Sequence, residues 1–287
     1  MNVTVAIVDA FIDGGEGGNP AGVVLDADDL SASQKRAIAA KVGLSETAFV
    51  SKSNSADFKL DFFTPQKQIA HCGHATIAAF SLLSQRGLIA GQTTSKETID
   101  GDRQIEVLAD FAYMRQTKPK YPHFDFTASD ICLSLGVHKN RTMALPAIVN
   151  TGNSFLILGV KTIKDLENLR PDYESIKAIS DQCDLIGFYV FSLETHNRDS
   201  DASTRMFAPR YGIKEESATG MAAGPLACFL HDQMHIDKDI FLIEQGYSMH
   251  PASPSLIKIV LSRQKQIIHS LKAGGIGKLS RYEEITI

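Results

Sequence analysis

The chain carries two copies of one short pattern, and this internal duplication constrains its fold more than any other feature. In the first copy, Phe63-Thr64-Pro65 precedes a helical segment that starts at Gly73; in the second, Phe207-Ala208-Pro209 precedes one that starts at Gly220. The offset between the copies stays near 141 to 147 residues, whereas solenoid repeats have periods of roughly 20 to 50 residues. The duplication therefore predicts two similar domains related by a pseudo-two-fold axis, with one cleft between them.

The length of the chain fits two domains of ordinary size. Its 287 residues are enough for two domains of roughly 100 to 200 residues each. Periodicity stops in the segment Thr117-Lys118-Pro119-Lys120-Tyr121-Pro122, where two prolines lie among polar and basic residues. Proline and polar clusters of this kind mark loops, so we expect the linker between the domains here.

The charge balance and the cysteines limit which binding partners and which cellular compartment are expected. A formal net charge of -4 and an isoelectric point near 6.1 give no basic footprint for nucleic acid or an anionic membrane. The four cysteines show no Cys-x-x-Cys spacing, and the first residues show no signal-peptide pattern. No apolar run reaches the roughly 20 residues of a membrane helix. We expect a cytoplasmic protein with free thiols that binds neither nucleic acid nor a membrane.

Residue patterns predict strands and helices in both halves. Ser31 with Gln34 forms a capping box, and Gly43 lies where a left-handed residue ends a helix, so a helix is expected between them, followed by an apolar strand. The other expected elements are strands at residues 3–11, 21–25, 58–63 and 105–113, a helix at 75–85, a hairpin at 146–160, a helix at 171–182, a strand at 187–193, a helix at 220–231 and four strand-like stretches at the end of the chain.

The two helix starts are candidate anion sites. A helix N-terminus exposes unpaired N–H groups and a partial positive charge, and Gly73 and Gly220 have no side chain to keep an anion away. The alternative is that both glycines only allow close helix packing. Their equivalent places in the two copies favour a shared function.

Glu46 is the candidate acid/base group. It stands at the start of an apolar strand, where a buried carboxylate would be suited to proton transfer near neutrality, and the second copy has Gly187 there. One carboxylate on a duplicated scaffold indicates a single acid/base residue. The alternative is a solvated glutamate at a strand end.

The segment His71-Cys72-Gly73-His74 has the residue types of a metal site but too few of them. Metal sites need three or four ligands, and no companion motif is found elsewhere, so no metal is expected. Cys72 lies at a helix start, where the dipole favours a thiolate that acts as a nucleophile or carbon base. Its counterpart Thr219 lacks that chemistry, and the alternative for Cys72 is a small buried residue at a helix start.

Two further signals concern carboxylates and cofactors. Glu215 and Glu216 stand just ahead of the second helix, either as site carboxylates or as charges favoured by the helix dipole. No Gly-x-Gly-x-x-Gly motif follows a strand, so no nucleotide cofactor is expected.

Taken together, these motifs resemble the PhzF-like isomerase family of phenazine biosynthesis, whose members are related to diaminopimelate epimerase. The matching segments are Gly18-Asn19-Pro20-Ala21, Gly43-Leu44-Ser45-Glu46-Thr47-Ala48-Phe49, Phe63-Thr64-Pro65, Cys72-Gly73-His74-Ala75-Thr76, Arg205-Met206-Phe207-Ala208-Pro209 and Ala218-Thr219-Gly220. The resemblance implies an α+β fold of two similar domains, each an antiparallel barrel or roll around a central helix. The implied domains are residues 1–117, completed by about 277–287, and residues 118–276.

The resemblance also implies cofactor-free acid/base isomerisation in the cleft of a homodimeric protein, on a small carboxylate-bearing substrate. It assigns catalytic roles to Glu46, His74 and Glu216, where Glu216 replaces the family's usual aspartate. Met221 replaces a common serine, and of the two epimerase cysteines only Cys72 is present. The implied substrate-binding residues are Asn19, Ser45, Cys72, Gly73, Thr219, Gly220 and Met221.

Two other functions remain open from the sequence. The departures at Glu216 and Met221 are compatible with a small-molecule binding or regulatory protein that has lost catalysis. An enzyme that depends on the Cys72 thiol is the third possibility.

Overall fold

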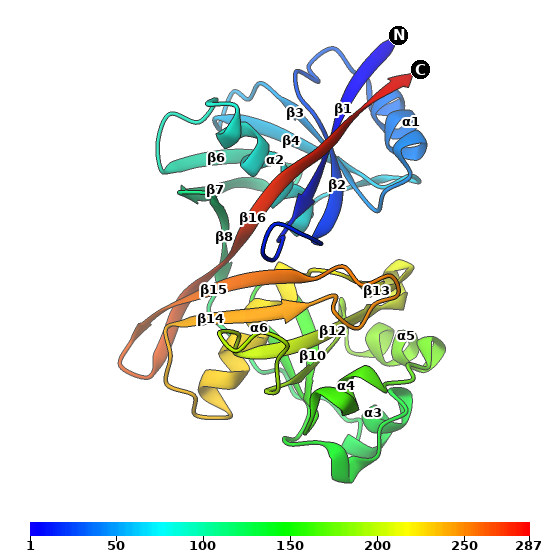
Figure 1. Ribbon diagram of the computed structural model, residues 1–287, viewed down its shortest axis with the longest axis vertical. Coiled ribbons are helices and arrows are strands. Elements are labelled where there is room, and N and C mark those ends of the chain that lie inside the picture. Colours follow the sequence, from blue (N-terminus) through cyan, green and yellow to red (C-terminus); the bar gives the residue numbers. More distant parts are fainter. The chain divides into compact units, whose positions relative to one another are not determined.

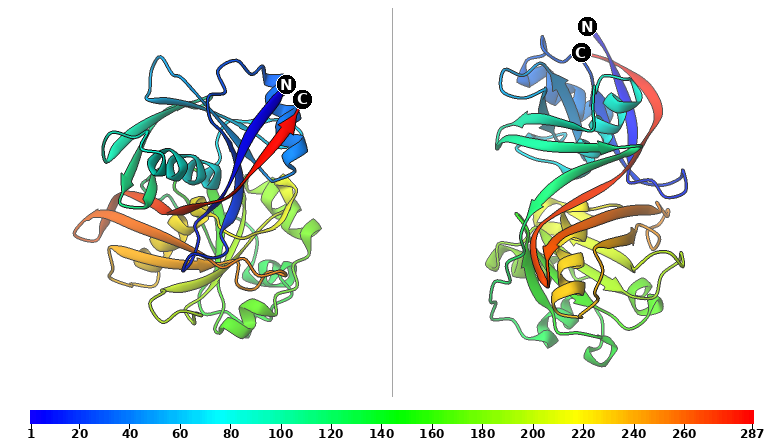
Figure 2. Two further views of the ribbon diagram at one scale, coloured as in Figure 1. Left: turned by 45° about the horizontal axis from the view of Figure 1, so that its top comes forward. Right: turned by 90° about the vertical axis from the view of Figure 1, so that its left-hand side faces the viewer.

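The computed structural model describes residues 1–287, and the chain divides into two compact units. Unit 1 comprises Met1–Arg115 and Gly274–Ile287, and unit 2 comprises Gln116–Ala273. Both termini belong to unit 1 and lie side by side in it (Figure 2), where the Met1 amino group donates a hydrogen bond of 2.6 Å to the carbonyl oxygen of Ile287. The end of the chain therefore completes unit 1.

Unit 1 is a closed ring of strands around one helix (Figure 1). The strands pair in the order β1-β2-β3-β4-β6-β7-β8-β16, and β16 pairs back to β1. Their bounds are β1 Asn2–Ala10, β2 Asn19–Val24, β3 Thr47–Ser51, β4 Phe58–Phe63, β6 Thr93–Thr98, β7 Gly101–Leu108, β8 Phe111–Thr117 and β16 Ile267–Thr286, with the short β5 Gln68–Ile69 beside β4. The helix inside the ring, α2 (Gly73–Gln85), is buried from its first residue to Leu83.

The helix α1 (Ala32–Val42) confirms the capping signals of the sequence. Ser31 and Gln34 form a complete capping box, and Gly43 ends the helix in the left-handed region with φ 70°. The side chains of Ile38 and Ala39 pack in the core of unit 1. This helix end leads the chain directly to Glu46 and β3.

Unit 2 repeats the plan with further strands of the same sheet and its own central helix, α6 (Gly220–Asp232). The strand order is β16-β15-β14-β12-β11-β10-β9, with β13 beside β12. The bounds are β9 Ala147–Asn150, β10 Ser154–Gly159, β11 Gly187–Ser192, β12 Ala202–Ala208, β13 Ile213–Glu216, β14 Ile240–Gln245 and β15 Ser255–Gln264, with helices α3 Ala128–Ser134, α4 Ile163–Glu167 and α5 Tyr173–Gln182 and the 3-10 turns η1 Lys139–Arg141 and η2 Pro209–Tyr211.

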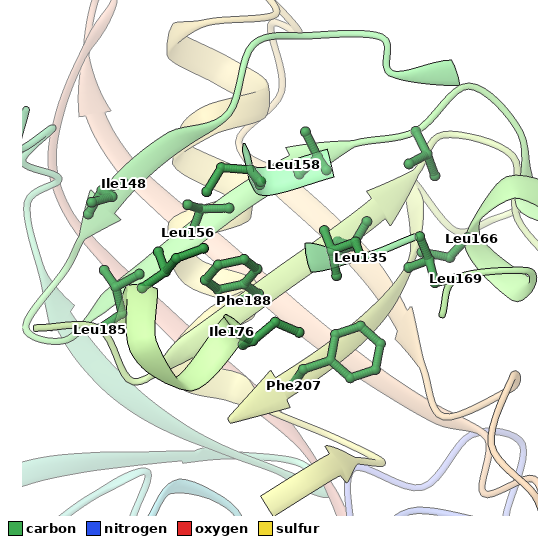
Figure 3. Packing of buried hydrophobic residues seen from close by; sticks show 14 residues of the cluster. Leu135, Ile148, Leu156, Leu158, Leu166, Leu169, Ile176, Leu185, Phe188 and Phe207 are labelled. Atoms are coloured by element: carbon green, nitrogen blue, oxygen red, sulfur yellow. The ribbon is translucent and has the colours of Figure 1, made fainter. Parts of the chain in front are cut away.

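An apolar core joins the sheet of unit 2 to its outer helices (Figure 3). Leu156 and Leu158 of β10 and Phe188 of β11 pack there with Ile176 of α5 and Leu135, which follows α3. Because successive strand residues point to opposite faces, the alternate residues of β10 face the other side of the sheet. Both faces of β10 are buried.

The duplication predicted from the sequence is visible in the strand pairing. In unit 1, β2 and β3 are parallel, β3 and β4 antiparallel, and β4 and β6 parallel. In unit 2, β10 and β11 are parallel, β11 and β12 antiparallel, and β12 and β14 parallel. In each unit the central helix follows a short strand, β5 or β13, that pairs with the preceding long strand.

Two expectations about strands are wrong. Residues 105–113 are not one strand, because the chain turns at Ala109 (φ 52°) and β7 pairs with β8. The chain ends in three strands rather than four, and the last one, β16, is 20 residues long. Its glycines indicate close packing rather than strand ends: a Cβ at Gly274 would meet the Tyr113 ring at 2.3 Å.

No helix of the structure is long and apolar enough to span a membrane. All four cysteines are free thiols, as expected.

Candidate active site

Glu46 lies directly before β3, and β2 fixes the position of its backbone. Its carbonyl oxygen accepts a hydrogen bond of 3.1 Å from the amide of Gly22. The side chain is buried, and its Oε2 atom lies 3.3 Å from Nε2 of His74 without the geometry of a hydrogen bond. A buried carboxylate oxygen without a donor is destabilising, so Oε2 is placed to take a proton or a donor group from a ligand.

The ring of His74 lies between a thiol and a carboxylate. His74 is the second residue of α2, and its Nδ1 atom lies 3.6 Å from Sγ of Cys72, whereas Nε2 faces Glu46. The Ser45 hydroxyl is 3.5 Å from the same Nε2 atom. A histidine whose two nitrogens face different groups can pass a proton between them. The structure therefore brings together four of the residues predicted from the sequence.

The first turn of α2 is suited to bind an anion. Cys72 is its N-cap residue and makes no side-chain cap hydrogen bond, in contrast to Ser31 at α1. The first N–H groups of a helix have no acceptor within the helix, and Gly73 adds no side chain in front of them. Burial raises the pKa of the Cys72 thiol, so this end of the helix carries no thiolate at neutral pH.

Glu46, Cys72 and His74 form a possible metal-binding group that the sequence did not reveal. One donor atom from each lies within 4.8 Å of the others, and all three residues are buried. Residue spacing does not indicate this set, because Glu46 comes from another part of the chain than Cys72 and His74. However, Nδ1 and Nε2 of the one imidazole face different partners, which suits proton transfer better than three donors directed at one ion.

Of the other expected binding residues in unit 1, Asn19 lies at the first position of β2. It pairs with Ala10 in β1 and is buried. Its part in substrate binding stays a prediction.

The predicted residues of unit 2 surround the start of α6. Glu216 ends β13 and accepts a hydrogen bond from the hydroxyl of Thr219, the N-cap residue. The buried Gln245 side chain accepts from the Thr219 amide at 3.0 Å and donates to the Glu216 carbonyl oxygen at 2.7 Å. This loop is therefore held rigidly in front of the helix.

The next two residues of α6 are also held by side chains. The Gly220 carbonyl oxygen accepts a hydrogen bond of 2.8 Å from the side-chain amide of Gln116. The sulfur of Met221 accepts one of 3.5 Å from the side-chain amide of Asn153. Met221 is half-buried at this helix start.

The structure distinguishes the two glutamates that precede α6. Glu215 forms a two-pronged ion pair with Arg205, with both contacts at 2.8 Å. Arg205 also donates to the carbonyl oxygens of Leu166 and Glu167, so this pair ties β12 to α4. Glu215 is therefore structural, which leaves Glu216 as the carboxylate beside the helix start.

Sequence reasoning missed a buried lysine behind the start of α2. Lys96 of β6 is 0% exposed, and its ammonium donates a 2.7 Å hydrogen bond to Oγ1 of Thr76 and lies 3.4 Å from Nδ1 of His71. The available signal was the alternation of β6, in which Thr94, Lys96 and Thr98 share the buried face. His71 thus faces this lysine rather than joining His74.

Known proteins resemble the chain over nearly its whole length. A family model described as phenazine biosynthesis-like protein matches residues 8–275. An uncharacterized isomerase of Clostridium acetobutylicum is 32% identical over 280 residues, which are 93% of this chain and 93% of that protein. A trans-2,3-dihydro-3-hydroxyanthranilate isomerase of Pseudomonas chlororaphis is 30% identical over 251 residues, which are 83% of this chain and 84% of that enzyme.

A solved structure extends the likeness to the fold. The crystal structure of a phenazine biosynthesis protein of the PhzF family from Bacillus anthracis has a TM-score of 0.91 at 27% identity and covers 100% of both chains. The α+β, diaminopimelate epimerase-like fold expected from the sequence is confirmed.

Proposed function

The chain belongs to the phenazine biosynthesis-like protein family, in which the relatives described above are isomerases, and we propose that it is a cofactor-independent isomerase that moves a proton on a small carboxylate-bearing substrate. In this proposal Glu46 removes the proton from one carbon and returns it to another. His74 orients the substrate or relays the proton, and the start of α2 holds the carboxylate.

The single observation that carries the proposal is the environment of Glu46. Its Oε2 atom is buried and lacks a hydrogen-bond donor, and the buried His74 ring lies 3.3 Å away. A general base needs an acceptor atom that no protein donor occupies, together with a neighbour that can stabilise the proton that it gains. Both conditions are met within unit 1.

The substrate carboxylate is where the start of α2 would lower the barrier to proton removal. Removal of a proton from a carbon near a carboxylate or its conjugated system leaves negative charge on the substrate. Preorganised N–H groups stabilise such charge, and the uncapped first turn of α2 offers them. Proton removal and charge stabilisation then come from neighbouring residues of one unit.

Unit 2 supplies the second proposed set of groups. Glu216 and Thr219 are hydrogen-bonded to each other ahead of α6, and Gln245 holds both. We assign Glu216 the task of tuning the substrate or the proton relay, and Thr219, Gly220 and Met221 that of binding. That these groups act on the same substrate molecule as Glu46 stays a prediction from the duplication of the chain.

The experiment is solvent-deuterium incorporation into carbon. The protein is incubated in D₂O with small cyclic and acyclic carboxylates, beginning with trans-2,3-dihydro-3-hydroxyanthranilate, and carbon-bound deuterium is followed by mass spectrometry. An isomerase of this kind incorporates deuterium into its substrate and into the product.

Two outcomes would contradict the proposal. Ligand-induced thermal stabilisation without any incorporation would favour the binding or regulatory protein. A folded Glu46→Gln protein that isomerises a compound at the rate of the wild type would mean that Glu46 does not carry the proton.

A further inference from the structure

Lys96 is a cation in the interior of unit 1 that pairs with no carboxylate. Its ammonium donates to Thr76, lies 3.4 Å from the ring nitrogen of His71 and is 4.9 Å from the centre of the Phe62 ring. None of these three neighbours carries a negative charge. A buried ammonium without a counter-ion destabilises the folded protein. A lysine at this position therefore indicates a role other than stability.

The hydrogen bonds of Lys96 lead to the first turn of α2. Oγ1 of Thr76 accepts a hydrogen bond from the ammonium and donates one of 2.6 Å to the Cys72 carbonyl oxygen. Two hydrogen bonds therefore connect the buried charge to the N-cap residue of the helix. The same contacts hold the backbone that precedes Gly73.

The charge of Lys96 has the same sign as the potential at this helix end. A helix N-terminus carries about half a positive charge, and an ammonium beneath it adds to that potential instead of cancelling it. The combination is unfavourable in the unliganded protein and becomes favourable when an anion binds in front of the helix. A neutral residue of similar size would avoid the unfavourable charge in the unliganded protein, but it would not strengthen the binding of an anion.

We propose that Lys96 is a positioning residue for a carboxylate site at the start of α2, which it holds through Thr76 and strengthens through its charge, so that anion binding and protonation of Lys96 are coupled. This inference rests on the proposed function for the chemistry of the ligand, a small carboxylate. It adds the residue that controls the affinity and its dependence on pH.

The ionisation of the surrounding groups fits this coupling. Burial lowers the pKa of Lys96 to about 7, and of the more distant charges Arg103 lowers it and Asp100 raises it. Burial and the nearby Lys96 lower the pKa of His71 to about 3, so this ring stays neutral. Lys96 therefore loses its charge as the pH rises above about 7, and a bound carboxylate opposes that loss.

The test uses benzoate as a simple carboxylate probe and measures binding rather than turnover. Its dissociation constant is determined at pH 6.0 and pH 9.0, at constant ionic strength, for the wild type, K96M and K35M. Lys35 is the matched control, because it is also a buried lysine of unit 1 but pairs with Asp61 at 2.6 Å.

We expect the wild type and K35M to bind benzoate about tenfold more weakly at pH 9.0 than at pH 6.0, which corresponds to about one pKa unit of coupling. K96M should bind weakly at both values, without this change. Thr76→Val should weaken binding while the dependence on pH remains, and Thr76→Ser should restore the affinity. Circular dichroism verifies that each variant is folded.

Three results would overturn the inference. They are equal affinities of the wild type and K96M at pH 6.0, the same dependence on pH in both, and no benzoate binding to the wild type at pH 6.0. Because no turnover is measured, a site that depends on Lys96 is distinguishable from a failure of Glu46-dependent exchange.

Discussion

The thiol of Cys72 lies against His74, yet its environment disfavours ionisation. Burial raises its pKa, and Sγ lies 3.6 Å from the ring nitrogen. We expect Cys72→Ser to keep deuterium incorporation within about tenfold of the wild type, since proton transfer by one group typically contributes roughly 10²- to 10⁴-fold and the hydroxyl retains the contact.

The control for Cys72 is the partly exposed Cys183, whose replacement by serine should have no effect. An inactive Cys72→Ser protein, beside an active Glu46→Gln protein, would instead establish the thiol enzyme that the sequence left open.

The burial of Lys96 also predicts how the free energy of unfolding depends on pH. Its pKa is about 7 in the folded protein and about 10.4 in an unfolded chain, so the unfolded chain binds more protons between these values. The free energy of unfolding of the wild type should therefore rise with pH from about 7 upward. K96M should be more stable than the wild type at pH 6, with a gap that narrows toward pH 10 in urea titrations.

K35M again serves as the control for that series. It loses the ion pair with Asp61 and should be less stable than the wild type at pH 6. A K96M gap of constant size from pH 6 to pH 10 would show that Lys96 keeps its ordinary pKa.

At the scale of elements, the close approach of β2 and β3 fixes the backbone of Glu46. A Cβ at Gly22 would lie 2.8 Å from Oγ1 of Thr47, and the Gly22 amide holds the Glu46 carbonyl oxygen. Gly22→Ala should cost about 1–3 kcal/mol in unfolding free energy and reduce deuterium incorporation by displacing Glu46.

Gly91 provides the comparison for Gly22, because a Cβ there has no neighbour within 4 Å and its φ is not positive. Gly91→Ala should leave stability and exchange nearly unchanged. Full activity of Gly22→Ala would mean that β2 does not control the position of Glu46.

The capping box of α1 gives a second prediction at this scale. Ser31→Ala removes the side-chain acceptor of the Gln34 amide and should lower the unfolding free energy by about 1 kcal/mol. Ser129→Ala, at an exposed position inside α3, is the control. Equal denaturation midpoints for the two variants would contradict a stabilising role of the cap.

Elements with a local chemical signal were predictable from the sequence. The cap residues of α1 determine its ends, and the starts of α2 and α6 follow from apolar segments behind a glycine. The turn at Ala109 was missed because its only turn-forming residue is Asp110, without the glycine that usually follows in a two-residue hairpin turn. The full length of β16 was not predictable either, because its glycines are required by close packing against distant residues such as Tyr113.

At the scale of the whole chain, the duplication predicted the architecture but not which side chains lie together in the candidate site. The repeated order of parallel and antiparallel pairs follows the repeated sequence pattern. The approach of Glu46 to His74 and the different roles of Glu215 and Glu216 depend on contacts between segments that local patterns do not specify. Lys96 was missed for the same reason.

The last strand is expected to be essential for unit 1. Residues Gly277 to Thr286 pair with the whole of β1, and their removal would leave an unpaired edge in a ring that is otherwise closed. A chain that lacks residues 277–287 should lose cooperative thermal unfolding and hydrogen-exchange protection in β1. Retained protection of β1 would contradict this role; Arg281→Ala, which changes only a side chain, is the control.

The central claim is that Glu46 carries the proton, and one rate comparison tests it most directly. On a compound into which the wild type incorporates deuterium, the initial rates of Glu46→Gln and of the exposed control Glu16→Gln are measured under the same conditions. We predict a loss of roughly 10²- to 10⁴-fold for Glu46→Gln and no loss for Glu16→Gln. A folded Glu46→Gln protein that exchanges at the rate of the wild type would contradict the account.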